Sequence, residues 1–310
     1  MNLSSAMAKQ RKVQLAAGVY AALATPRRPE SIEADTAALL DYLDTVVRTG
    51  VDGLVLFGST GEFVHFDTEE RMRVCSLAIK RSRVPVLVNV SHSTLDGAIQ
   101  LAESACGLGA SGVLLMPPYF YRYKDEQIAA FYAQFMAMFA GQLPVYLYNL
   151  PFFTNPMSAA LAVNLLETGK FAGIKDSSGE WGMFEALLAL RKEQEFRLLA
   201  GHECIYLRAR MGGADGIVSG VAAAMPELMV ALDRACVAGD SLKAGRLNQR
   251  LMEFLPWVER FPSTVAIKQA AVARGWKQRH LAAPVDAAQI TEYQVWLSEW
   301  IPQVLRESAS

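Results

Sequence analysis

Eight apolar runs of strand length recur along the first 220 residues, and this repeat restricts the fold more than any other feature of the chain. The runs cover residues 18–24, 53–57, 85–90, 112–116, 144–148, 171–175, 196–200 and 216–219. Segments with helical periodicity lie between them, at residues 32–48, 68–81, 95–106, 126–139, 158–167 and 180–193. Continuous apolar strands that alternate with amphipathic helices are typical of a parallel sheet covered on its outer face. Eight such units predict an α/β fold, a closed (β/α)₈ TIM barrel.

The same pattern divides the 310-residue chain into three parts. We expect the barrel to span residues 18–224, because barrels of this type fill about 250 residues as one domain. From residue 225 onward helical patterns punctuated by prolines replace the strand-like runs, which predicts a C-terminal helical region over residues 225–310. Residues 1–17 contain no apolar run of signal-peptide length and are predicted to form a flexible N-terminal tail.

Composition argues for a small-molecule ligand. The formal charge is -1 and no long basic run occurs, which disfavours nucleic acid as a partner. No stretch approaches the roughly 18 apolar residues that a membrane-spanning helix needs. Four cysteines are far apart and lack zinc-like spacing, which indicates reduced and mostly buried thiols. We therefore expect a cytoplasmic protein that contacts neither a membrane nor nucleic acid.

Lys175 ends the sixth apolar run, which passes directly into the turn residues Asp176-Ser-Ser-Gly179. Active sites of (β/α)₈ barrels lie at the carboxyl ends of the strands. An amine at the mouth of a buried strand loses solvation, which disfavours its ammonium form and leaves a lone pair that can attack a carbonyl carbon. The simpler interpretation is a lysine that ends a strand and points into water, so other residues must support a reactive role.

Two further strand ends carry groups that would complete a reactive site. Ser59 and Thr60 lie between two glycines after the second run, in a tight loop whose backbone N–H groups can hold a carboxylate. Tyr148 ends the fifth run, where alternation along the strand can turn its phenol toward the barrel axis, close to Lys175 on the next strand. Each group alone suits an ordinary turn or core position, but an amine, a phenol and a hydroxyl loop at one mouth favour catalysis.

The motifs Gly58-Ser-Thr-Gly-Glu62, Tyr148-Asn-Leu-Pro151 and Gly173-Ile-Lys-Asp-Ser-Ser-Gly179 occur in this order along the chain. In sequence and spacing they resemble the dihydrodipicolinate synthase / N-acetylneuraminate lyase family of pyruvate-dependent class I aldolases, from about residue 18 to the helical end. The resemblance implies a homotetramer built as a dimer of dimers, and a small-molecule 2-oxo acid and an aldehyde as substrates.

The resemblance also implies roles for single residues. Lys175 would form an imine with pyruvate or another 2-oxo acid, and Tyr148 would be the general acid and base. Ser59 and Thr60 would bind the substrate carboxylate, and one of them would link Tyr148 into a proton relay. This covalent imine on Lys175 requires no cofactor.

Backbone positions Gly201 and Val218 would line the pocket. We also expect no metal, because His65, His92, His202 and His280 show no close ligand spacing.

Two positions depart from the synthase branch of the resembled family. Phe153 stands where that branch has an arginine that holds an acidic second substrate, and an uncharged ring cannot supply the bidentate contact that a carboxylate favours. The simplest alignment puts Phe120 where that branch has the second of two consecutive tyrosines, and the neighbouring Tyr119 and Tyr121 stay open as substitutes for it. Phe63, Phe152 and Phe153 are equally consistent with core positions and with an apolar entrance.

Four functions remain open from the sequence. The first is a Schiff-base-forming class I lyase that makes or cleaves the carbon–carbon bond of a hydroxy-2-oxo acid. The second is 4-hydroxy-tetrahydrodipicolinate synthase, which joins pyruvate and aspartate semialdehyde and which Phe153 disfavours. The third is a dehydratase of a deoxy-oxo-sugar acid, and the fourth is a non-catalytic 2-oxo-acid sensor. A sensor does not require a reactive lysine, so the conjunction of Lys175, Tyr148 and the hydroxyl loop favours an enzyme.

Overall fold

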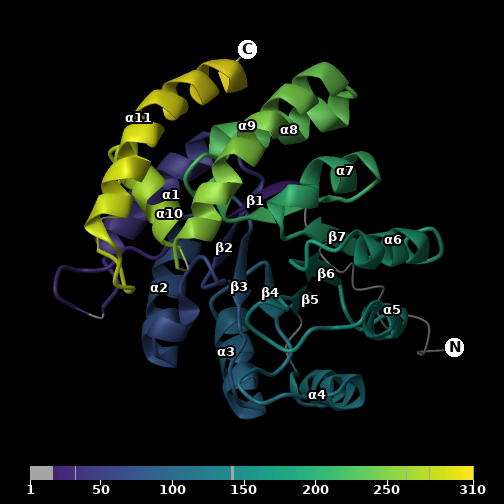
Figure 1. Ribbon diagram of the computed structural model, residues 1–310. Helices are drawn as coiled ribbons and strands as arrows, with labels where there is room; N and C mark the ends of the chain where they lie inside the picture. The colour runs from purple at the N-terminus through teal and green to yellow at the C-terminus, as the bar shows by residue number, and fades with distance from the viewer. Residues whose placement is uncertain (1–16, 32, 141–142, 263, 279, 310) are drawn as a thin grey trace, which may run out of the picture.

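The computed structural model describes residues 17–31, 33–140, 143–262, 264–278 and 280–309. Its strands are parallel and form a closed barrel in chain order. Figure 1 shows the barrel with its covering helices. All eight predicted strands are present and each end lies within two residues of its predicted position. They are β1 (Gly18–Ala22), β2 (Gly53–Leu56), β3 (Val86–Asn89), β4 (Gly112–Leu115), β5 (Val145–Asn149), β6 (Gly173–Asp176), β7 (Arg197–Ala200) and β8 (Gly216–Ser219).

Helices follow the strands and cover the outside of the barrel. They are α1 (Thr36–Arg48), α2 (Thr68–Arg81), α3 (Leu95–Gly107), α4 (Asp125–Met138), α5 (Ala159–Glu167), α6 (Trp181–Leu190), α7 (Tyr206–Met211) and α8 (Pro226–Ala238). α1 begins later than predicted because the Asp35 carboxylate accepts a hydrogen bond from the Ala38 N–H and so caps the helix there. α7 was not predicted, since six residues are too few to show a helical repeat.

The strands carry apolar residues on both faces, and nearly every strand residue is buried. Inward side chains fill the barrel and outward side chains pack under the helices, so the middle of the barrel is core. The rim formed by the carboxyl ends of the strands is therefore the part of the barrel where a reactive site can lie. Pairing of β5 with β6 places Tyr148 directly opposite Lys175 at this rim.

The C-terminal region continues with α9 (Ser241–Arg260), α10 (Val265–Ala273) and α11 (Ala287–Ala309). α9 and α11 pack against α8, and α10 packs against α9 and α11 (Figure 1). Stacked aromatic rings join α9 to α11; the Phe254 and Trp300 ring centroids, for example, are 5.3 Å apart. The helical appendix is therefore present. α8 packs against β1 as the eighth barrel helix and also against α9 and α11, so a domain boundary at residue 225 stays a prediction.

Several other expectations can be compared with the described residues. The predicted tail lies outside them except for residue 17. Within the described ranges, no helix combines the length and apolar character needed to cross a membrane. The four cysteines form no disulfide, but the expectation that most are buried was wrong: Cys75 is buried, Cys106 and Cys236 are half-buried and Cys204 is exposed.

Candidate active site

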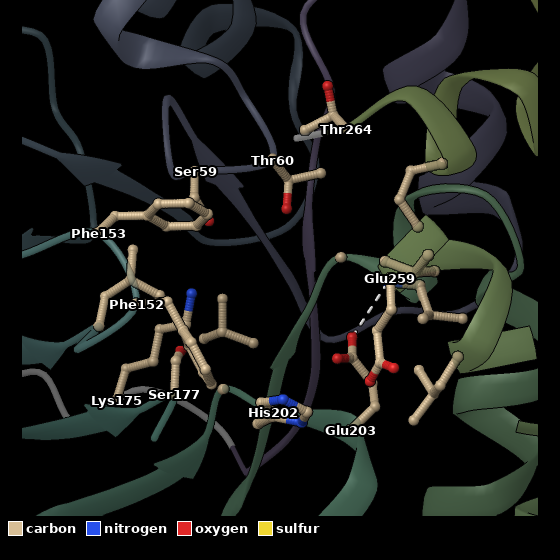
Figure 2. A pocket seen from close by; sticks show the side chains of 18 of the residues that line it. Ser59, Thr60, Phe152, Phe153, Lys175, Ser177, His202, Glu203, Glu259 and Thr264 are labelled. Atoms are coloured by element: carbon tan, nitrogen blue, oxygen red, sulfur yellow. Dashed lines mark hydrogen bonds between the residues drawn. The ribbon is translucent and has the colours of Figure 1, made fainter. Parts of the chain in front are cut away.

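A cavity of about 590 Å³ opens at the carboxyl ends of the strands. All seven predicted site residues line it: Ser59, Thr60, Tyr148, Phe153, Lys175, Gly201 and Val218. The cavity also receives residues from α9, from α10 and from the segment between them, so the C-terminal region forms one of its walls. Figure 2 shows the side chains that line the cavity.

Lys175 is buried, with 4% of its surface exposed, and its side chain reaches the cavity. Its Nζ lies 4.0 Å from the centroid of the Tyr148 ring. Among the described residues no carboxylate forms an ion pair with this amine. In Figure 2 the amine points toward the loop that carries Ser59. Lys175 is thus a buried amine that faces the cavity and has no carboxylate partner among the described residues.

Hydrogen bonds on the other face of β6 fix the strand end that carries Lys175. The Asp176 carboxylate accepts bonds from Asn149 Nδ2 and Ser178 Oγ, both at 2.7 Å, and burial raises the pKa of Asp176. Asn149 Oδ1 in turn accepts from the Met157 N–H at 3.1 Å. These bonds connect the ends of β5 and β6, and they therefore fix Tyr148 relative to Lys175.

The loop after β2 brings two hydroxyls to the same cavity. Ser59 Oγ lies 3.3 Å from the Tyr148 hydroxyl, within hydrogen-bonding distance. Thr25 Oγ1 donates to the Gly61 carbonyl at 2.8 Å and holds the loop against the segment that follows β1. The backbone N–H groups of Ser59 and Thr60 donate to no acceptor among the described residues, so they remain available to an anionic ligand.

Glu62 follows the hydroxyl loop in a left-handed conformation, with φ of 55°, and forms an ion pair with Lys268 of α10. Both side chains are almost completely inaccessible to solvent. The pair joins the hydroxyl loop to the C-terminal helices across the edge of the barrel. It is a buried charge pair in which each partner depends on the other, since an unpaired buried charge is strongly unfavourable.

Replacing Lys268 with methionine is expected to lower the free energy of unfolding by about 3–5 kcal/mol, because Glu62 would stay buried without its partner. Urea denaturation followed by circular dichroism measures the change. Arg28→Met, which breaks an exposed ion pair with Glu33, serves as the control and should cost no more than about 1 kcal/mol. Equal effects of the two substitutions would contradict a stabilising role for the buried pair.

The aromatic residues divide between core and rim. Phe63 is buried and packs edge-on against Tyr119 at 5.9 Å, which is a core contact. Phe152 and Phe153 are 64% and 70% exposed and line the cavity, so these two rings form an apolar entrance. Phe120 is 86% exposed, has a left-handed φ of 84° and is not among the residues that line this cavity.

Sequence reasoning did not single out five polar residues of the cavity as site residues: Ser177, His202, Glu203, Glu259 and Thr264. Ser177 could have been found, because it lies two residues beyond Lys175 and therefore on the same face. His202 and Glu203 follow β7 directly, where barrel sites are expected. Glu259 belongs to α9, and nothing in the local sequence connects that helix with the barrel mouth.

Comparison with protein families finds one match that covers most of the chain. Residues 15–299 match the model described as the Dihydrodipicolinate synthetase family.

Similar proteins have names that span two activities. A 4-hydroxy-tetrahydrodipicolinate synthase of Methanosphaerula palustris is 30% identical over 273 residues, which cover 87% of this chain and 93% of that protein. A probable 2-dehydro-3-deoxy-D-pentonate aldolase of Escherichia coli is 31% identical over 225 residues, which cover 71% of this chain and 74% of that protein.

A solved structure agrees with the fold over nearly the whole chain. It is that of YagE, a prophage protein of the dihydrodipicolinic acid synthase family from Escherichia coli K12, in complex with pyruvate. The TM-score is 0.86 at 26% identity, with 92% of this chain and 98% of that chain covered.

Proposed function

The chain belongs to the dihydrodipicolinate synthetase family and is a lyase of that family, and on this premise we propose that it is a class I aldolase acting through an imine on Lys175. Its substrates would be pyruvate, or another 2-oxo acid, and an aldehyde. The single observation that carries this proposal is the buried amine of Lys175, which faces the cavity beside Tyr148 and forms no ion pair with a described carboxylate.

The proposed chemistry begins with attack of Lys175 Nζ on the ketone carbon of the 2-oxo acid. Loss of water gives an iminium, which withdraws electrons from the adjacent carbon. Removal of a proton from that carbon then forms an enamine, whose carbon adds to the aldehyde carbonyl and makes the new bond. Water finally hydrolyses the product imine and frees the amine. Cleavage of a hydroxy-2-oxo acid follows the same steps in reverse.

Two groups near Lys175 suit the remaining roles. The Tyr148 hydroxyl would transfer protons to and from the reacting atoms, and Ser59 would hold that hydroxyl in place. The free N–H groups of Ser59 and Thr60 would bind the carboxylate of the 2-oxo acid. No cofactor beyond the covalent imine enters these steps.

Phe153 favours aldol chemistry over dipicolinate synthesis. It lines the entrance as an exposed uncharged ring, and no arginine is found among the described residues that line the cavity. Aspartate semialdehyde carries a carboxylate that would have no cationic partner at this ring. The names of the relatives do not separate the two reactions, since a synthase and an aldolase are about equally similar to the chain.

Borohydride reduction in the presence of pyruvate tests the proposal. Reduction converts the imine into a stable secondary amine, so peptide mass spectrometry should find the pyruvate-derived adduct on Lys175. Absence of an adduct, or its presence on a different lysine, would refute the assignment.

Gly201→Ala is expected to slow adduct formation by about ten- to a hundredfold, because a displaced nucleophile loses its alignment with the carbonyl. A Cβ at this position would lie 2.1 Å from Ser177 Oγ and 2.8 Å from Lys175 Cε. Gly182→Ala is the matched control, since a Cβ there meets no atom within 4 Å. An unchanged rate of adduct formation in Gly201→Ala would show that Lys175 does not need the space left by the missing side chain of Gly201.

We also propose a cytoplasmic homotetramer built as a dimer of dimers. The support is the family resemblance together with Phe120, whose large ring is 86% exposed on a left-handed backbone in the single chain. Light scattering during size-exclusion chromatography measures the oligomer mass.

A further inference from the structure

Two carboxylates line the wall of the cavity that lies across from Lys175. Glu203 belongs to a short turn of helix after β7, and Glu259 to the last turn of α9. Figure 2 places both on the opposite side of the cavity from Lys175. Among the described residues that line the cavity, two side chains can carry positive charge, those of Lys175 and His202. This wall therefore presents negative charge to a ligand.

Glu203 is held in a fixed position. Its Oε1 accepts hydrogen bonds from Ser219 Oγ at 2.7 Å and from the Val221 N–H at 3.2 Å, and the bond to Val221 is drawn in Figure 2. Its Oε2 has no hydrogen-bond donor among the described residues. One oxygen thus fixes the carboxylate, and the other is left to accept a hydrogen bond from a ligand.

Neither charge is neutralised by a neighbour. In the described part of the chain, no lysine, arginine or histidine forms an ion pair with Glu203 or Glu259. The two carboxylates also affect a neighbouring group. Burial raises the pKa of the Cys204 thiol, and the charges of Glu203 and Glu259 raise it further. A ligand group at this wall therefore meets two uncompensated carboxylates.

We propose that Glu203 and Glu259 select an aldehyde that carries hydroxyl groups and no negative charge, and that they exclude partners with a terminal phosphate or carboxylate. The inference rests on the proposed function, in which Lys175 holds the 2-oxo acid at one end of the cavity. The second substrate then extends from that carbon toward the opposite wall.

Hydrogen bonding and electrostatic repulsion both favour an uncharged, hydroxylated aldehyde at this wall. Carboxylate oxygens accept hydrogen bonds from hydroxyl groups, and such bonds to a charged acceptor are strong. A second anion at this wall would meet like charges in a cleft with low-dielectric sides, where electrostatic interactions are enhanced. The exposed rings of Phe152 and Phe153 complete the entrance without offering a charge to an anion.

A matched pair of aldehydes tests the proposal: D-glyceraldehyde and D-glyceraldehyde 3-phosphate, each with saturating pyruvate. Product formation by mass spectrometry should give a kcat/KM at least about tenfold higher for the uncharged aldehyde. Glu203→Gln and Glu259→Gln should each reduce this preference severalfold, and Glu259→Lys should reduce it further. Because Glu259 is exposed, its contribution should also weaken as salt is added, which a merely structural effect would not do.

Glu299→Gln is the control, since Glu299 is exposed on α11 and does not line the cavity. It removes the same charge and should leave the preference unchanged. Borohydride trapping of pyruvate alone is measured for every variant. Lack of trapping in the unmodified protein contradicts the proposed function. Three results with normal trapping contradict the charge selection alone. They are equal use of both aldehydes, use of the phosphorylated aldehyde only, and use of neither aldehyde.

Discussion

Lys175→Met is expected to abolish borohydride-trappable pyruvate and to lower the rate of carbon–carbon bond formation by about four orders of magnitude or more. Methionine fills nearly the same volume as lysine but has no amine, so the cavity should keep its shape while the covalent step is lost. The measurements are peptide mass spectrometry after reduction and the steady-state rate with pyruvate and glyceraldehyde. Circular dichroism confirms that the variant is folded.

Lys170→Met provides the matched control, because Lys170 is exposed and lies five residues before Lys175. It should retain both trapping and turnover. The more demanding comparison is Lys268, the other deeply buried lysine among the described residues. Burial lowers the pKa of Lys268, but its ion pair with Glu62 acts in the opposite direction and favours the ammonium form, whereas no described carboxylate pairs with Lys175. Residual adduct on Lys268 in the Lys175→Met variant would show that burial, rather than the lack of a counterion, determines which amine reacts.

The fold was predictable because each strand carries the same local signal. Buried parallel strands are apolar on both faces and are followed by amphipathic helices, so periodicity alone finds them. The signal fails where an element is short, as with α7. α8 continues the barrel alternation and also packs against α9 and α11, so the domain boundary at residue 225 stays a prediction.

Lys175, Tyr148 and the hydroxyl loop were predictable because barrel topology converts position along a strand into position in space. Residues at the ends of consecutive strands must meet at one rim, and pairing of Tyr148 with Lys175 follows directly. Glu259 could not be found in this way. Its place at the cavity depends on how α9 packs beside the barrel, which is a tertiary contact between segments far apart in the chain.

The positions of the aromatic residues could not be predicted from the sequence either. Phe63, Phe152 and Phe153 are indistinguishable by residue type, yet Phe63 is a core residue while the other two form the entrance. The difference arises from the loops that carry them. Phe63 begins a short helical turn that packs under Tyr119, whereas Phe152 and Phe153 lie in the turn after β5, between Leu150 and Thr154. Loop conformation of this kind has no periodic signal in the sequence.

Tyr148→Phe is expected to lower turnover by about 10²- to 10⁴-fold while leaving the cavity intact, because only the proton-transferring hydroxyl is removed. The phenyl ring that lies 4.0 Å from Lys175 Nζ remains in place. Exchange of the pyruvate methyl protons with deuterated water, followed by NMR, isolates the step that forms the enamine. This exchange should fall with turnover, and exchange within about threefold of the unmodified rate would exclude Tyr148 as the base.

Ser59→Ala separates a direct role from a positioning role. Ser59 contacts the Tyr148 hydroxyl at 3.3 Å, so its removal should reduce exchange by about three- to tenfold through misplacement of that hydroxyl. In the Tyr148→Phe background the hydroxyl is already absent, and Ser59→Ala should then have almost no further effect on exchange. If the double variant instead lowers the exchange rate by the product of the two single reductions, Ser59 acts on the substrate independently of Tyr148. This is the result expected if the main role of Ser59 were to bind the carboxylate.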